Sequence, residues 1–224
     1  MSNPPSDHHD TWVREYLAPR YPELVPAYLD ARAIYENGRA SGSLGQPEAE
    51  RLLAHARSPR TPLGENAATM LGELCANIPT LGAAIRLLAT GRRVHERVNA
   101  LVALHSCPPT SLHIELLALL LQDKSARVRA LAADKVVIHR IKELAAALGV
   151  ASSREAKVEV ADELRAELDY LNQGFHARRN GGSVWVTCRP PHGGSVSKVF
   201  TLQEFQTAGP GWISDQLCQA ANEA

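Results

Sequence analysis

The chain has 224 residues, with 24 lysines and arginines against 24 aspartates and glutamates, so its net charge is zero and its pI is about 7.1. This balance excludes a global basic field that would collect nucleic acid or an anionic membrane surface. Apolar residues make up 45% of the chain and aromatic residues only 5%. The chain therefore folds rather than staying disordered, and alanine and leucine, which are strong helix formers, must fill most of its core.

The four cysteines are isolated from one another, and no CxxC pair occurs: Cys75, Cys107, Cys188 and Cys218. We read them as reduced thiols of a cytoplasmic protein. The opening residues MSNPPSDHHDTW contain no apolar region typical of a signal peptide. The sequence has no run of 18 apolar residues, so we expect no membrane-spanning helix. We expect a cytoplasmic location and no membrane partner.

Residues 1–45 are predicted to be an N-terminal helical segment. Its main helix runs from Pro22 to about Asn37, with Gly38 as a left-handed stop. One face of this helix is apolar at helical spacing and includes Tyr28 and Tyr35. The two tyrosines could line a ligand site, but core packing with the hydroxyls at the rim is the more economical interpretation.

Residues 46–173 show seven consecutive helical segments joined by short loops. One of them, DKSARVRALAADKVVIHRIKELAAALG, is predicted to end at Gly149. The next begins with Ser152-x-x-Glu155, which has the spacing of a capping box. The flanking Pro, Thr and Ser residues supply helix starts throughout this region.

The helical segments repeat. ERVNALVAL (residues 96–104) lies 30 positions before ARVRALAAD (residues 126–134), and EAKVEVADEL (residues 155–164) lies 29 positions beyond the latter. A period near 30 with two helices per unit predicts an α-solenoid, because a single hairpin cannot bury its apolar face alone.

The stretch LLLQDKSARVRALAA resembles the HEAT repeat, with the match mainly at residues 117–133. The resemblance implies a mainly α fold: a HEAT-like right-handed α-solenoid of helical hairpins. In HEAT proteins an Asp and an Arg form polar ladders between repeats, and this role falls here on Asp123 and Arg129. The equivalent positions hold Arg93 and Asn99 in the preceding unit, and Ser152 and Val158 in the following one, so we expect a discontinuous ladder.

After residue 173 the apolar period changes from helical to alternating. Residues 174–224 are predicted to form a small antiparallel β-meander followed by a helix, all packed on the last repeat. The expected strands are 175–179, 183–189 and 195–201, with Gly-rich turns between them. Val184, Val186 and Cys188 should face one side of the sheet and Trp185 and Thr187 the other. Thr201 and Glu204 form a second capping-box pattern.

Residues that could carry chemistry are few. His176, Cys188 and His192 could supply three zinc ligands, but their spacing matches no zinc motif and a fourth ligand is missing. His8, His9 and Asp10 form a weaker metal candidate. No nucleotide, protease or esterase fingerprint occurs, and none of the cysteines has a nucleophile signature. We therefore expect no catalytic residue, no cofactor and no metal.

Two basic clusters are the candidate partner-binding sites. One includes Arg93 and Arg97 on one helix and Arg127 on a later one; the other is Arg178, Arg179 and Trp185 on the meander. Exposed Arg and Trp are frequent anchors of protein interfaces.

The sequence thus favours a non-enzymatic protein-binding module, and more specifically a cytoplasmic inhibitor or immunity protein that neutralises a toxin or enzyme. The alternative is a nucleic-acid-binding HEAT-like protein related to DNA-alkylation-repeat proteins, which would use the first cluster as a cationic strip.

Overall fold

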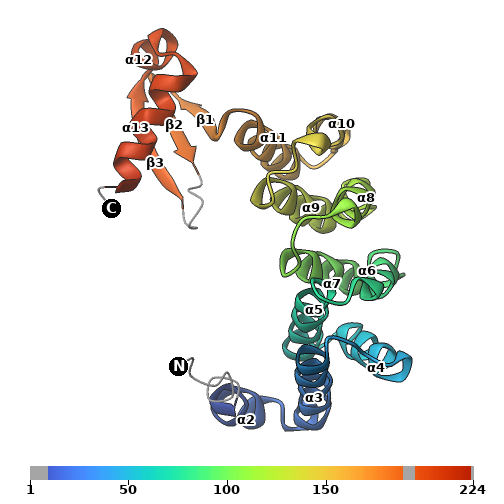
Figure 1. Cartoon of the computed structure of the whole chain (residues 1–224). Coiled ribbons are helices and arrows are strands. Elements are labelled where there is room, and N and C mark those ends of the chain that lie inside the picture. The colour runs from blue at the N-terminus through green and yellow to red at the C-terminus, as the bar shows by residue number, and fades with distance from the viewer. Residues whose placement is uncertain (1–9, 189–194, 223–224) are drawn as a thin grey trace. The chain divides into compact units, whose positions relative to one another are not determined.

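The computed structural model describes residues 10–188 and 195–222. These residues are mainly helical, with one small antiparallel sheet near the C-terminus (Figure 1). The chain divides into two compact units, residues 1–116 and 117–224. The division falls inside one helix, α8 (Ser111–Leu120), in the region predicted as continuous repeats. Among the described helices, none combines the length and the apolar character needed to span a membrane.

The first unit stacks its helices in two layers. Helices α3, α5 and α7 pack one on the next, while α4 packs on α5, α6 packs on α7, and α4 also contacts α6. Leucine and alanine fill the space between the layers, as the composition predicts. The elements in chain order are η1 (Val13–Leu17), α2 (Ala18–Arg20), η2 (Pro22–Leu24), α3 (Val25–Ser41), α4 (Gln46–Ala56), α5 (Thr61–Cys75), η3 (Pro79–Leu81), α6 (Gly82–Ala89) and α7 (Val94–His105).

Helices α5 and α7 approach so closely that their backbones touch. A Cβ added to Gly72 on α5 would lie 2.0 Å from the carbonyl oxygen of Ala103 on α7. No side chain larger than hydrogen fits such a gap without moving a helix. Asn99 on α7 is buried, and its Nδ2 donates to the carbonyl oxygen of Ala56 at the end of α4, 2.7 Å away.

The N-terminal helix is longer than predicted. α3 continues through Gly38, which is buried and lies close to Leu44 and Leu74, and ends at Gly42 with φ +68°. The prediction of Gly38 as the stop was wrong, because this glycine serves close packing and Gly42 takes the left-handed conformation. Tyr28 is buried in the core, as expected.

The helices of the second unit are α9 (Ala126–Ile138), η4 (Lys142–Leu144), α10 (Ala145–Arg154) and α11 (Val158–Gln173), and α11 packs on both α9 and α10. The segment predicted to run unbroken to Gly149 is interrupted at Arg140, which has φ +51°. The capping box predicted at Ser152 was also wrong. Ser152 lies within the last turns of α10, and Glu155 follows the end of that helix.

Helices α5, α7, α9 and α11 begin 33, 32 and 32 residues apart. This register differs from the alignment of the sequence repeats by two residues between α7 and α9 and by three between α9 and α11, and it makes Arg97 the equivalent of Arg129. Nη1 of Arg97 donates to the carbonyl oxygen of Gly91, and Nη1 of Arg129 donates to that of Asp123, at 2.8 and 2.5 Å. Both arginines therefore close the loop that precedes their own helix.

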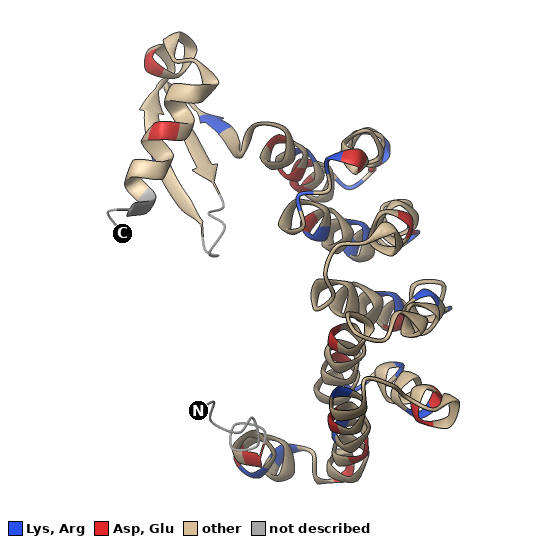
Figure 2. Ribbon diagram, in the orientation of Figure 1, with Lys and Arg blue, Asp and Glu red and all other residues tan. Residues whose placement is uncertain are grey.

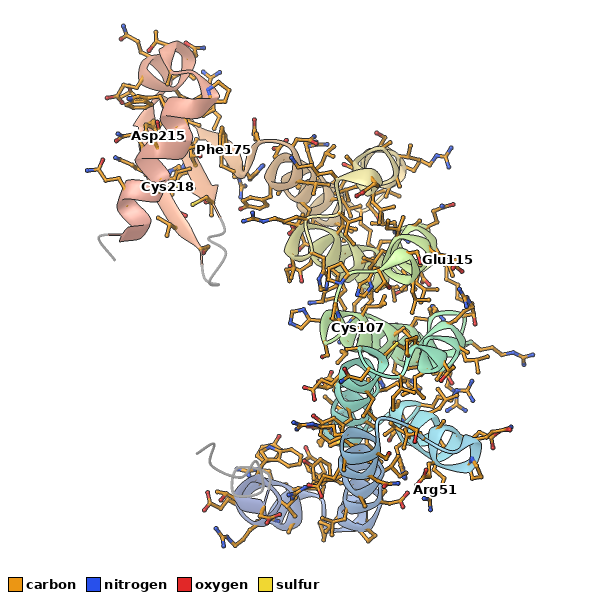
Figure 3. All side chains as sticks on the ribbon, in the orientation of Figure 1. Arg51, Cys107, Glu115, Phe175, Asp215 and Cys218 are labelled. Atoms are coloured by element: carbon orange, nitrogen blue, oxygen red, sulfur yellow. The ribbon has the colours of Figure 1, made fainter. Side chains whose placement is uncertain are left out.

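The sheet has the order β1-β2-β3, with β1 (Phe175–Asn180), β2 (Ser183–Cys188) and β3 (Val196–Thr201) in antiparallel pairs. The predicted meander is confirmed. Its inner face packs on α13 (Pro210–Asn222) through a small core of Phe175, Val184, Val186, Phe200, Ile213 and Leu217. Phe175 lies where α11 passes into β1 (Figure 3). Thr201 caps α12 (Leu202–Thr207) and Glu204 completes the predicted capping box.

Candidate protein-binding site

The three arginines of the first cluster have different surroundings. Arg93 is exposed at the start of α7, and Arg127 is exposed on the first turn of α9. Arg97 is 5% exposed, and its Nη1 donates to the carbonyl oxygens of Gly91 and Arg92. A guanidinium in that position holds the preceding loop and offers little surface to a partner.

Neighbouring cations of the same helices are also engaged locally. Arg129 forms an ion pair with Glu155, whose side chain is almost fully buried, through Nε at 2.8 Å and through Nη2. Lys135 lies 3.1 Å from the carboxylate of Asp134. Two of the cations on α9 are therefore paired with carboxylates of the same unit and contribute less positive charge to a nucleic-acid surface.

Arg178 and Trp185 of the second cluster lie on the outer face of the sheet, opposite the small core. Arg178 pairs across β1 and β2 with Trp185, which in turn pairs with Val199 on β3. The Trp185 and Val199 side chains are 50% and 48% exposed. An indole and a branched apolar side chain therefore lie side by side in solvent, flanked by a guanidinium.

An open groove of about 1090 Å³ lies between α11 and the strands β1 and β2. Its lining includes all three residues of the second cluster, and acidic side chains of α11 form the opposite wall. Figure 2 shows the acidic residues on α11 and the arginines on β1, the strand that follows it. The residues that line the groove are Glu159, Asp162, Glu163, Arg165, Ala166, Asp169, His176, Ala177, Arg178, Arg179, Asn180, Trp185 and Thr187.

The charges of this groove are partly paired. Asp162 accepts from Arg165 at 2.9 Å, and Asp169 lies 2.8 Å from Nδ1 of His176. Arg179 donates from Nε to the carbonyl oxygen of Gly181. Within the described part of the chain, the side chains of Glu159, Glu163 and Arg178 make no hydrogen bond or ion pair. Unpaired charge of both signs thus faces the same hollow.

The sequence predicted the residues on the strand side of the groove, Arg178, Arg179 and Trp185, but not the acidic residues of α11 on the opposite side. The acids of α11 recur at helical spacing in EVADELRAELD, which places them on one face. That spacing predicts a solvated helix face. It carries no information about the strand that lies across from it.

Of the weak zinc candidates His176, Cys188 and His192, the two that the structure describes lie on opposite faces of the sheet. His176 pairs with Thr187 on the outer face of the sheet, whereas Cys188 pairs with Phe175 and faces inward. His192, His8 and His9 lie outside the described residues. Within the described ranges, no group of three His, Cys, Asp or Glu side chains could hold a metal ion.

All four cysteines are free thiols, as expected. Cys75 and Cys107 are buried together in the first unit, and the hydrogen bond between them lowers the pKa of Cys75 and raises that of Cys107. Cys218 is exposed on α13 (Figure 3). Burial raises the pKa of the Cys188 thiol, which is the reverse of what a nucleophilic cysteine needs.

We compared the chain with models of protein families, with curated proteins and with solved structures, and found no match in any of the three.

Proposed function

We propose that the protein is a non-enzymatic module that binds another protein through the outer face of its C-terminal sheet and the adjoining groove. The observation that carries this proposal is the exposed row of Arg178, Trp185 and Val199. A half-exposed tryptophan beside an unpaired arginine is the kind of anchor that dominates the energy of protein interfaces. The groove beside it supplies a concave surface with charge of both signs.

The proposal includes a HEAT-like right-handed α-solenoid as the scaffold. Support comes from the two-layer packing of helices in the first unit and from helix starts that recur every 32 or 33 residues. Stacked hairpins of this kind present extended surfaces that suit a macromolecular partner. Arg97 and Arg129 make the same kind of hydrogen bond to the loop before their own helix, so two successive repeats share this contact.

Within this class, we assign the protein to the inhibitors that neutralise a toxin or another enzyme in the cytoplasm, as immunity proteins do. The β1–β2 hairpin carries Arg178 and Trp185 on one face, close to its tight Gly181-Gly182 turn. A hairpin with a two-residue turn and with an aromatic and a cationic side chain on one face suits insertion into the cleft of a partner.

The experiment begins with a photo-crosslinking amino acid in place of Val199, in cells of the natural host. The protein that becomes attached is then purified and titrated against the wild-type chain, Trp185→Ala and a control, Leu87→Ala. Leu87 is also 50% exposed but lies on α6 in the other unit. We expect affinity to fall at least about 30-fold for Trp185→Ala and to stay unchanged for the control. Equal affinities for all three chains would overturn the proposal.

Two further measurements test the class of partner. If the partner is an enzyme, its activity should fall to zero at one equivalent of the wild-type chain, and full activity at saturation would contradict the inhibitor role.

Binding to a radiolabelled DNA duplex at about 50 and 200 mM salt tests the nucleic-acid-binding alternative. Tight binding that weakens about 10³-fold over this range would identify a nucleic-acid-binding protein instead.

A further inference from the structure

Strand β1 lies at one edge of the sheet. Among the described strands it comes first in the order β1-β2-β3 and has β2 as its single neighbour. In an antiparallel pair, every second residue directs its N–H and C=O away from the neighbouring strand. Gln173 donates from Nε2 to the carbonyl oxygen of Phe175 at 3.0 Å, which places Phe175 in this outward set. Ala177 and Arg179 follow at the same spacing and belong to the set as well.

The outward backbone groups of Ala177 and Arg179 border the groove. Both residues line it, and within the described part of the chain their outward N–H and C=O groups have no protein partner. Such groups form a ready template for another extended chain. A helix could not use them, because its own backbone groups are already paired. The geometry therefore favours an extended occupant over a helical one.

The α11 wall determines the charge of that occupant. Its carboxylates at Asp162 and Asp169 are engaged by Arg165 and His176, which leaves the exposed carboxylates of Glu159 and Glu163. These two residues are one helical turn apart, and both line the groove. A segment lying along β1 would present alternate side chains to this wall, and lysine or arginine at those positions would meet both carboxylates.

We infer that the groove takes an extended, basic segment of the partner protein, which adds to β1 as a fourth strand and directs Lys or Arg side chains toward Glu159 and Glu163. This inference rests on the proposed function and specifies how the partner is recognised. Trp185 lies on the central strand β2, one strand away from the pairing edge, and stays exposed to another part of the partner. The basic side chains of the added strand lie on the outer face, where Asp169 of α11 contacts His176.

The first test uses a phage-displayed library of random nine-residue peptides, selected against the full chain. We expect enrichment of peptides with Lys or Arg at alternate positions. Synthetic versions should bind the double variant Glu159→Gln/Glu163→Gln about three- to tenfold more weakly than the wild type at low salt. The control Glu143→Gln, an exposed acid on η4 outside the groove, should bind like the wild type. Enrichment of acidic peptides, or no enrichment, would overturn the inference.

The second test examines strand pairing. Single N-methyl groups are placed along the best peptide, one amide at a time. An added strand donates only alternate N–H groups to β1, so affinity should fall at least tenfold at every second position and stay within about twofold at the others. On binding, amide exchange of Ala177 and Arg179 should slow. A loss without this alternation, or unchanged exchange at both residues, contradicts strand addition.

Failure of the inference can be told apart from failure of the proposed function. Suppose that the purified partner binds Trp185→Ala more weakly than the wild type but binds Glu159→Gln/Glu163→Gln equally well. The proposed binding surface is then supported, and the extended basic occupant is contradicted. If Trp185→Ala leaves partner affinity intact, the proposed function itself fails.

Discussion

The α5–α7 contact and the outer face of the sheet differ in burial: the first is closely packed, and the second leaves large side chains exposed to solvent. Between α5 and α7, Gly72 lets two backbones touch, and the buried amide of Asn99 satisfies a carbonyl of α4. On the sheet, Trp185 and Val199 remain half exposed, and the edge groups of Ala177 and Arg179 have no partner within the described chain. The contacts of the first region stabilise the fold, whereas the side chains and edge groups of the second remain accessible to a partner.

This contrast separates residues whose substitution should change stability from those whose substitution should change binding. Arg97 and Trp185 were both expected to bind a partner. Arg97 is buried and holds its own loop, so it belongs with the first group. Trp185 can lose its side chain with little change to the core, since Val184 and Val186 fill the inner face.

The largest expected effect follows from Gly72→Ala. Its new methyl group would overlap the Ala103 carbonyl, and separating α5 from α7 should cost about 3 kcal/mol of unfolding free energy. For a chain of this length, that lowers Tm by roughly 6–12 °C, measured by circular dichroism. The matched control is Gly149→Ala on α10, where the nearest atom would be 3.7 Å away. It should be neutral or stabilising by about 1 kcal/mol. Equal effects of the two would contradict the close contact.

Asn99→Ala should have a smaller effect on the same region. It removes the donor to the Ala56 carbonyl and leaves a buried acceptor unsatisfied, which should cost about 1–3 kcal/mol in denaturant unfolding. Asn172→Ala on the exposed surface of α11 should change stability by less than about 0.5 kcal/mol. If Asn99→Ala changed the free energy of unfolding as little as this control, the hydrogen bond between Asn99 and Ala56 would not contribute to stability.

The ion pair of Glu155 and Arg129 should give a stability difference that depends on pH. Hydrogen bonds from the Lys157 backbone and from Arg129 hold the pKa of Glu155 below its usual value. A carboxyl with a lowered pKa stabilises the fold above its unfolded pKa, and this contribution is lost as pH falls through the folded pKa. Glu155→Gln should therefore have a lower Tm than the wild type at pH 7, and the gap should close below about pH 4. A gap that is constant with pH would rule out this role.

The strands were predictable from sequence because two local signals agreed. Residues alternate between inward and outward positions from Phe175 onward, and Gly181-Gly182 supplies the turn. The break at Arg140 could not be predicted in the same way. This residue adopts φ +51° without being glycine, within a run of helix formers. The packing of Ile141 and Leu144 in the core accompanies that turn, and tertiary packing leaves no mark in a local pattern.

The candidate site was only half predictable for a similar reason. Trp185 and Arg178 stood out because an indole and a cation alternate with apolar residues. The burial of Arg97 depends on carbonyl groups in a loop five and six residues earlier, which only the folded loop brings within reach. The groove depends on the path of β1 beside α11, and the α11 sequence alone predicts nothing more than a charged helix.

The most direct test of the account is an amide-exchange footprint of the complex with the purified partner. The account predicts slower exchange in the sheet and on α11, concentrated at 159–169 and 176–187, with unchanged exchange in α5 and α7. Protection confined to α5 and α7, with the sheet exchanging at its free rate, would contradict the assignment of the binding surface.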